Sequence, residues 1–292
     1  MDETILVTGA TGTVGSEVVK QLSKNALSYN IKAGVHSVEN ANKIQQYDRV
    51  EAILIDYDKQ EGLQVAFKGT DKLFLLTHPS SKSAEHESNL VSEAKRSGIS
   101  HIVKQSIMGA DLEADVEAMR LHRQAEKAIE ESGISYTFLR PNEFMQGFIN
   151  FQGPTIRNHN AFYIPAENAK VSIVDARDIA SIAVKSLMDS NRHYNKTYLI
   201  TGPEALSYHQ AAEILSNATS KKIQYVNISD EKAREAMKEA GLDDWLINTI
   251  LDLYSYFRKG YASQVASAVE EVTGKKPIAF AQFAKEHVDA FK

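Results

Sequence analysis

Three glycines near the start of the chain have the spacing of a phosphate-binding turn. Gly9, Gly12 and Gly15 follow the apolar run Ile5–Val7 and lead into an amphipathic segment. Glycine lets the chain turn sharply and leaves no Cβ between the backbone and an anion. A helix that starts there adds unpaired N–H groups and a partial positive charge. The pattern predicts a dinucleotide pyrophosphate bound by Gly9, Thr11, Gly12, Thr13, Val14 and Gly15.

One histidine is the candidate catalytic residue. His122 lies four residues before Glu126, so in a helix over Val116–Ser132 the two side chains share a face and can hydrogen-bond. Histidine titrates near neutral pH and can act as an acid or as an anchor for the nicotinamide ribose. In the alternative interpretation, His122 is a satisfied histidine at the edge of a core stripe made of Ala118, Leu121, Ala125 and Ile129.

Further candidate cofactor contacts follow the predicted strands, because ligands of open α/β sheets bind beyond the C-terminal ends of the strands. Most of these residues are polar, and those after the sixth strand would form the floor beneath the nicotinamide. In chain order they are His36, Ser37, Asp56, Tyr57, Thr77, His78, Pro79, Gln105, Ser106, Pro141, Asn142 and Phe144. Asp56 would either cap the next turn or bind the adenine amino group, and His78 is equally well explained as a plain loop histidine.

The end of the second predicted strand favours NADP(H) over NAD(H), with NAD(H) still possible. An NAD site usually has a carboxylate there that accepts from the ribose 2′-hydroxyl. Here the chain reads Val35-His36-Ser37, with no acid before Glu39. A 2′-phosphate would therefore meet no repulsion, and His36 and Ser37 could bind it, with Lys43 as a distant helper. The alternative is that these are solvated loop residues.

Short apolar runs alternate with amphipathic stretches over the first two-thirds of the chain, as βαβ units of a parallel sheet require. Glycines at 69, 98 and 133 fit helix C-caps. The fold class expected is α/β, a doubly wound parallel (Rossmann) sheet. The predicted strands are Thr4–Thr8, Lys32–His36, Glu51–Ile55, Lys72–Leu76, His101–Gln105 and Ser135–Arg140, and the predicted helices are Gly15–Lys24, Ala41–Gln46, Glu61–Phe67, His86–Ser97 and Val116–Ser132.

The rhythm changes beyond Asn142. Short strands are predicted at Val171–Val174 and Thr197–Thr201 around a helix at Ala176–Met188, and later residues read as mostly helical. We expect a core at 1–155, to which 171–202 returns, and a smaller, mainly helical lobe from 156–170 and 203–292. Candidate substrate-pocket aromatics are Phe148, Tyr163, Trp245 and Tyr254, although aromatics at helical spacing more often belong to a core.

Composition excludes several classes of function. The 292 residues carry a net charge of −5 and no cysteine. Disulfides, thiolate catalysis and cysteine-based metal sites are thereby excluded, and clustered basic residues for nucleic acid are missing. One histidine and one glutamate supply too few ligands for zinc, so no metal is expected. Without a signal peptide or a long apolar run, a cytoplasmic protein without membrane contact is the expectation.

The motif Gly-Ala-Thr-Gly-x-x-Gly resembles the extended and atypical short-chain dehydrogenase/reductase superfamily. Asp56-Tyr57, the block Ser132–Asn142 and the segment Val272–Pro277 are similar to the NmrA-like family, essentially over the whole chain, and most similar to its members that reduce dyes and quinones. In that family an arginine often stands at the place of His36. The superfamily's Tyr-x-x-x-Lys pair aligns with Ala118 and His122, so the resemblance implies that the proton-donating tyrosine is missing.

Two functions fit these observations. The first is an NAD(P)H-dependent oxidoreductase that passes hydride to a small-molecule electron acceptor of the quinone, cationic dye or imine type, which needs little enforced protonation. The second is a non-catalytic NAD(P) sensor that binds a protein partner. A homo-oligomer is compatible with both, and fold alone does not decide between them.

Overall fold

The structure of the protein is a computed structural model that describes residues 2–25, 28–44, 46–112 and 116–292. The chain divides into two compact units. Unit 1 contains Met1–Leu112, Met119–Arg140 and Ile179–Tyr198, and unit 2 contains Glu113–Ala118, Pro141–Asp178 and Leu199–Lys292. The two units are described in turn.

Unit 1 is built on a sheet whose strands, in the described part of the chain, follow the order β3-β2-β1-β4-β5-β6-β9. Neighbours from β3 to β6 are parallel, and in the register Val7 stands opposite both Ala33 and Phe74. The chain passes from β3 on one side of β1 to β4 on the other side, so the strand order reverses between β1 and β4. In such folds ligands bind at this switch point, beyond the C-terminal ends of the strands. The strands are β1 (Glu3–Val7), β2 (Tyr29–Val35), β3 (Val50–Leu54), β4 (Lys72–Leu75), β5 (His101–Gln105), β6 (Ser135–Pro141) and β9 (Lys196–Ile200).

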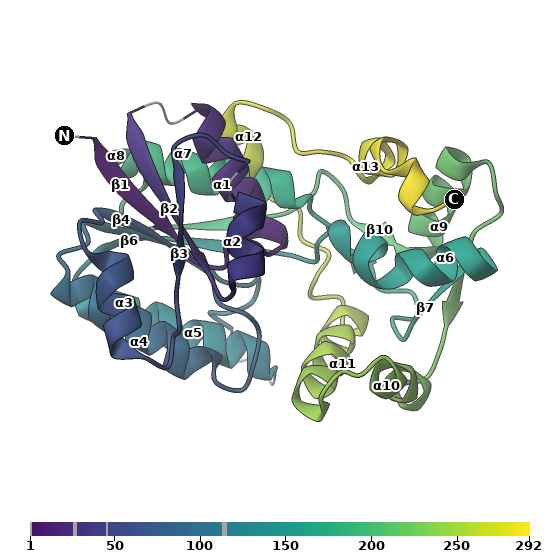
Figure 1. The fold of residues 1–292 in the computed structure, drawn as a ribbon. Coiled ribbons are helices and arrows are strands. Elements are labelled where there is room, and N and C mark those ends of the chain that lie inside the picture. Colours follow the sequence, from purple (N-terminus) through teal and green to yellow (C-terminus); the bar gives the residue numbers. More distant parts are fainter. Residues whose placement is uncertain (1, 26–27, 45, 113–115) are drawn as a thin grey trace. The chain divides into compact units, whose positions relative to one another are not determined.

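Helices cover both faces of this sheet (Figure 1). On one face, Leu63, Phe67, Leu90 and Ile129 from three helices pack on strand residues such as Phe138 in one buried cluster. On the other, α7 is tied to the strands where the carbonyl oxygen of its last residue accepts from the Tyr29 hydroxyl. The helices are α1 (Thr13–Asn25), α2 (Val38–Ile44), α3 (Gln60–Phe67), α4 (Ser83–Arg96), α5 (Glu117–Ser132), α7 (Ala176–Met188) and α8 (Ser190–His193).

The predicted strands and helices of the first half are confirmed, with ends that shift by a few residues. Residue 45 of the helix predicted at Ala41–Gln46 lies outside the described residues. The strand predicted at Val171–Val174 is wrong in length and in place. Only Lys170–Val171 is a strand (β8), and it pairs with β10 (Leu206–Ser207) in a separate small sheet. The Ser172 N–H donates instead to the carbonyl oxygen of Ala262, 3.0 Å away, which ends the ladder.

Unit 2 is mainly helical, with an aromatic centre. Phe148 contacts the rings of Phe162, Tyr208 and Phe280, and all four are almost fully buried. Besides β8 and β10, the strands β7 (Ala161–Ile164) and β11 (Gln224–Asn227) pair in parallel. The helical segments are η1 (Phe148–Gln152), α6 (Gly153–His159), α9 (Tyr208–Thr219), α10 (Asp230–Glu239), α11 (Asp244–Arg258), α12 (Ala268–Thr273), α13 (Phe280–Glu286) and η2 (Val288–Ala290).

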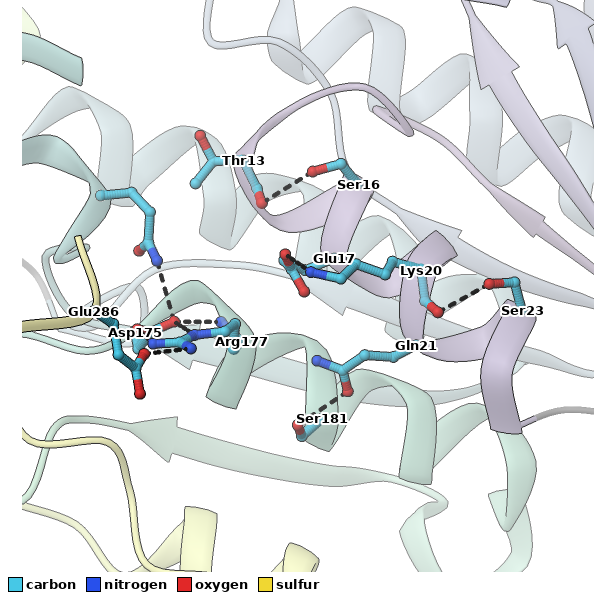
Figure 2. Close-up of polar contacts among 11 residues, drawn as sticks. Thr13, Ser16, Glu17, Lys20, Gln21, Ser23, Asp175, Arg177, Ser181 and Glu286 are labelled. Atoms are coloured by element: carbon cyan, nitrogen blue, oxygen red, sulfur yellow. Dashed lines mark hydrogen bonds and ion pairs between the residues drawn. The ribbon is translucent and has the colours of Figure 1, made fainter. Parts of the chain in front are cut away.

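A buried aspartate fixes the segment that enters α7. Asp175 accepts from the backbone N–H and the guanidinium of Arg177, and its Oδ1 also accepts from Gln146 Nε2 at 3.1 Å. Figure 2 shows Arg177 folded back on Asp175, with Glu286 on the same guanidinium. Because the carboxylate is fully paired by these donors, we interpret it as structural.

Among the described residues, no helix has the length and apolarity that a passage through a membrane requires.

Candidate functional site

The glycine turn leaves β1 in a conformation that only glycine fits. Gly9 has φ +62°, and a Cβ there would lie 2.9 Å from the carbonyl oxygen of Leu76. A Cβ on Gly15 would lie 2.1 Å from the carbonyl oxygen of Gly9. Thr8 fastens the turn to the end of β4, since its hydroxyl donates to the Leu76 carbonyl oxygen and accepts from the Leu76 N–H, each at 2.9 Å. Gly9 and Gly15 are therefore required by packing alone.

Gly12 is different, because it is exposed at the surface. A Cβ at Gly12 would meet only the Gly9 carbonyl oxygen, at 3.3 Å, and the residue is exposed. The first helical bond of α1 runs from the Ser16 N–H to the Gly12 carbonyl oxygen, so the N–H groups of Thr13, Val14 and Gly15 form the first turn, where a helix has no internal acceptors. Val14 is 1% exposed, which restricts it to a backbone contact. This arrangement suits an approaching phosphate.

The flank of α1 is held by side-chain contacts. Figure 2 shows the Ser16 hydroxyl donating to the Thr13 carbonyl oxygen and Glu17 paired with Lys20. One turn further, Ser181 of α7 donates to Gln21. The first two contacts lie within α1, and the third joins α1 to α7 behind the turn. Thr11 and Thr13 remain at least partly exposed beside it.

The ring of His36, after β2, is oriented by the next strand. Its Nδ1 lies 3.0 Å from the Ile55 carbonyl oxygen, and its ring meets that of Tyr57 edge-on at 4.8 Å. A carbonyl oxygen only accepts, so Nδ1 carries a proton and Nε2 faces away from this bond. Burial raises the pKa of Tyr57 to about 12. Ser37 caps α2, because its Oγ accepts from the Asn40 N–H.

Asp56 caps the turn that follows β3. Its Oδ1 accepts from the Asp58 N–H at 3.1 Å, and its Oδ2 lies 2.9 Å from Lys59 Nζ. The hydrogen bond from Lys59, followed by that from Asp58, lowers the pKa of Asp56. The capping alternative from the sequence is thus realised, and an adenine contact stays a prediction.

A buried ion pair that the sequence did not predict joins β5 to α4. Lys104 Nζ is 2.7 Å from Glu87 Oε1, and the two side chains are 0% and 3% exposed. The same ammonium donates to the Gln105 carbonyl oxygen at 2.7 Å and contacts His122 Nδ1 at 3.2 Å. Thr77 joins the group by donating from Oγ1 to Glu87 Oε1. Residues in β5, after β4 and on the helices α4 and α5 thus converge on one charged centre.

The ammonium determines the proton positions of His122. Lysine has hydrogens to donate and no lone pair, so His122 Nδ1 must be the acceptor of this bond. The proton of the neutral ring therefore belongs on Nε2. Burial, and then the positive charge of Lys104, lower the pKa of His122 well below its ordinary value. At neutral pH the residue is an uncharged N–H donor.

The predicted pairing of His122 with Glu126 is wrong. The Glu126 carboxylate instead binds Arg140 through Oε1 and Oε2 at 2.9 and 2.7 Å, and Arg123 through Oε2. A bidentate guanidinium is the stronger partner for a fully buried carboxylate. The core side of α5 is also different from the predicted stripe. Its buried residues are Met119, Ala125, Glu126 and Ile129.

Two polar atoms at the end of β5 lack partners in the described part of the chain. Gln105 Oε1 and Ser106 Oγ are buried and make no hydrogen bond there. Buried polar atoms without partners are rare in native proteins and need an explanation, such as a ligand. His78 and Pro79, after β4, are exposed on the surface of the same unit. These positions suit a ribose or nicotinamide.

In unit 2, the residues after β6 are rigidly held. Asn142 Nδ2 donates to Ser172 Oγ and to the Ala262 carbonyl oxygen, both at 2.8 Å. Phe144 forms a parallel bridge with Val174, and Pro141 is buried at the end of the strand. The backbone that leaves the strand is thereby fixed.

The structure does not bring the four predicted pocket aromatics together. No ring contact joins any two of them among the described residues. Phe148 is 2% exposed and belongs to the aromatic centre, so no face of its ring is open to a ligand in this conformation. Tyr163 is 40% exposed, Tyr254 stacks edge-on with Phe257, and Trp245 Nε1 donates to Glu117 Oε1 at 3.0 Å.

The chain matches the model of the NmrA-like family over residues 1–284. It is 35% identical over 287 residues to the NAD(P)H azoreductase of Xenophilus azovorans, covering 98% of this chain and 99% of the relative. The resemblance inferred from the glycine motif and the Ser132–Asn142 block is confirmed.

Solved structures show the same Rossmann fold. The triphenylmethane reductase of Citrobacter sp. complexed with NADP(H) superposes with a TM-score of 0.86 at 27% identity, covering 97% of this chain and 99% of that one. The NADPH-dependent quinone oxidoreductase of Escherichia coli complexed with NADPH gives a TM-score of 0.86 at 25% identity, with coverages of 97% and 99%. The predicted fold class is confirmed.

Proposed function

The chain belongs to the NmrA-like family, and from this premise we propose that it is an NAD(P)H-dependent reductase of small organic acceptors. The acceptors are of the quinone, azo, cationic dye or imine type, which a hydride reduces directly. The names of the relatives support this class of acceptor. They are an NAD(P)H azoreductase, a triphenylmethane reductase complexed with NADP(H) and an NADPH-dependent quinone oxidoreductase.

The glycine turn supports the cofactor assignment. The exposed position of Gly12 and the first-turn N–H groups of Thr13–Gly15 fit a pyrophosphate. The unpartnered Gln105 Oε1 and Ser106 Oγ supply polar atoms for the ribose and nicotinamide. Contacts from Pro141, Asn142 and Phe144 are part of the same proposal. When bound, the reduced nicotinamide supplies the hydride.

The observation that carries the proposal is the state of His122. Its Nε2–H is available because Lys104 occupies Nδ1, and its lowered pKa keeps it uncharged. A neutral N–H donor can hold a ribose hydroxyl or stabilise negative charge on an acceptor oxygen or nitrogen. It contributes orientation and electrostatics while the cofactor provides the reducing power.

We propose NADP(H) as the preferred cofactor, with NAD(H) as a weaker substitute. His36 and Ser37 lie after β2, where the ribose 2′-position is bound in this fold. Because His36 Nδ1–H is engaged by Ile55, the ring donates to a 2′-phosphate from Nε2 only when it is protonated.

The proposal is tested with purified protein, NADPH and a panel of azo compounds, quinones, triarylmethane dyes and imines. Oxidation of NADPH, followed at the absorbance band of the reduced nicotinamide, is expected with at least one class. Binding is measured separately by calorimetry, which we expect to show tighter association of NADPH than NADH. Tight binding with no turnover for any acceptor would refute the reductase and favour the sensor.

A further inference from the structure

Glu87, on α4, is a buried carboxylate in the same unit as the glycine turn. Its Oε1 accepts from Lys104 Nζ at 2.7 Å and from Thr77 Oγ1 at 3.1 Å. Lys104 and Thr77 are buried as well and belong to the same unit. Because a buried ion pair adds little net stability compared with well-packed apolar residues, its presence here calls for another explanation.

The ammonium of Lys104 has two further contacts. Nζ donates to the Gln105 carbonyl oxygen at 2.7 Å and lies 3.2 Å from His122 Nδ1. Its three hydrogens thus have three acceptors, one on α4, one on α5 and one in β5 itself. An ammonium whose hydrogens are all engaged is held in one orientation, and it has no lone pair that could accept a proton from the ring.

The groups around this ammonium leave its charge dependent on Glu87. Those that titrate are Glu87 on α4 and His122 on α5, with Tyr57, after β3, near the carboxylate. Burial and, to a lesser extent, the charge of Glu87 raise the pKa of Tyr57 to about 12, so this phenol is neutral. Among the described residues, Glu87 is the one carboxylate that forms an ion pair with Lys104. A buried lysine without a counter-charge can already be a neutral amine at neutral pH, so Glu87 keeps the ammonium charged.

We propose that Glu87 is a positioning residue of the cofactor site, which acts through Lys104 to hold the His122 ring as an Nε2–H donor at acidic and alkaline pH alike. The inference rests on the proposed function, in which this N–H holds a ribose hydroxyl of the cofactor. Without Glu87, Lys104 becomes an amine whose lone pair can accept from the ring. The ring proton then moves from Nε2 to Nδ1, and the donor for the ribose is lost.

The test variant is Glu87→Gln, which keeps an amide oxygen for Thr77 and Lys104 and removes only the charge. The His122 ring is followed by ¹⁵N NMR without cofactor. Between about pH 9 and about pH 6, the wild type is expected to carry its proton on Nε2 throughout, because the ammonium occupies Nδ1. Glu87→Gln is expected to show a mixture of the two tautomers at high pH, and the Nε2–H form returns as the lysine regains its proton.

Calorimetry measures the consequence for the cofactor. At about pH 8, where the amine of the variant is neutral, Glu87→Gln is expected to bind NADPH more weakly than the wild type. The expected loss is roughly 3- to 10-fold, as for one hydrogen bond. In a His122→Ala background, Glu87→Gln should cost no further affinity, because its effect passes through the ring. A general loss of stability would lower the affinity in both backgrounds.

Glu85→Gln, an exposed change in the first turn of α4, is the matched control and should alter neither the ring nor the affinity. If Glu87→Gln does not fold, the wild type decides alone. A wild-type ring with its proton on Nδ1, or one that changes tautomer between about pH 6 and about pH 9, overturns the role of Glu87.

The remaining outcomes separate this role from the proposed function. A folded Glu87→Gln whose ring keeps the wild-type tautomer at every pH overturns the positioning role and leaves the reductase intact. An equal loss of NADPH affinity in the His122→Ala background does the same. If the wild-type protein binds no NADPH, the proposed function itself fails, and the positioning of a cofactor donor fails with it.

Discussion

Replacement of Lys104 by methionine is expected to destabilise the protein strongly. The ammonium and the Glu87 carboxylate are 2.7 Å apart and 0% and 3% exposed. Removal of one partner from a buried ion pair costs about 3–5 kcal/mol, since the other charge is left without compensation. The Gln105 carbonyl oxygen also loses its donor, which adds about 1 kcal/mol. The total expected loss is about 4–6 kcal/mol in the free energy of unfolding.

Urea denaturation of Lys104→Met, of the double variant Lys104→Met/Glu87→Gln and of the wild type measures this loss. The double variant should regain most of it, because both charges are gone and Thr77 can still donate to the new amide oxygen. Lys127→Met, an exposed change on α5, is the control. A single variant within about 1 kcal/mol of the wild type would show that no charge is buried at this position.

The double variant also tests the proton positions of His122. In the wild type, ¹⁵N NMR should show a neutral ring with its proton on Nε2, because Nδ1 accepts from Lys104. Without the ammonium, the Nδ1–H form becomes populated and the pKa of His122 rises, since a neighbouring positive charge that lowers it is removed. An unchanged tautomer and an unchanged pKa would contradict this assignment.

Three further outcomes are expected. His36→Arg should tighten NADPH relative to NADH roughly 10-fold in calorimetry, by adding a permanent charge-assisted bond to the 2′-phosphate; an unchanged ratio would place that phosphate elsewhere. Gly12→Ala should fold normally yet lose NADPH affinity, while Gly15→Ala, whose Cβ would lie 2.1 Å from a backbone oxygen, should lose thermal stability as well; equal melting temperatures would contradict the packing argument. His122→Ala should weaken NADPH binding or turnover up to roughly 10-fold and His122→Gln, which keeps an N–H donor, less so; unchanged kinetics would mean that His122 belongs to the core.

Local sequence signals predicted much of unit 1. Apolar runs of strand length predicted the positions of the strands, because helices bury both faces of the sheet and each strand is therefore apolar on both sides. The glycines at helix ends adopt the left-handed conformation expected of them, with φ of +67° at Gly69, +74° at Gly98 and +78° at Gly133. Each of these features depends on a few neighbouring residues, and the sequence contains them directly.

Features that depend on distant partners were missed. Glu126 was paired with His122 from helical spacing, but Arg140 on the next strand outcompetes it. The strand at β8 was overestimated because its ladder is ended by Ala262, far along the chain. The position of Lys104 in the sequence is one signal from which a buried ion pair could have been predicted. A lysine inside an apolar strand flanked by buried positions needs a buried carboxylate, although spacing alone does not identify Glu87 as that partner.

Two titratable groups, one in each unit, have pKa values shifted in opposite directions. The pKa of His122 is lowered by burial and by Lys104, so the ring has one firmly held proton and no second proton to release. The pKa of Glu143 is raised by burial to about 7, against the opposing effect of the hydrogen bond from Tyr208. His122 therefore suits charge stabilisation by hydrogen bonding in the proposed reductase.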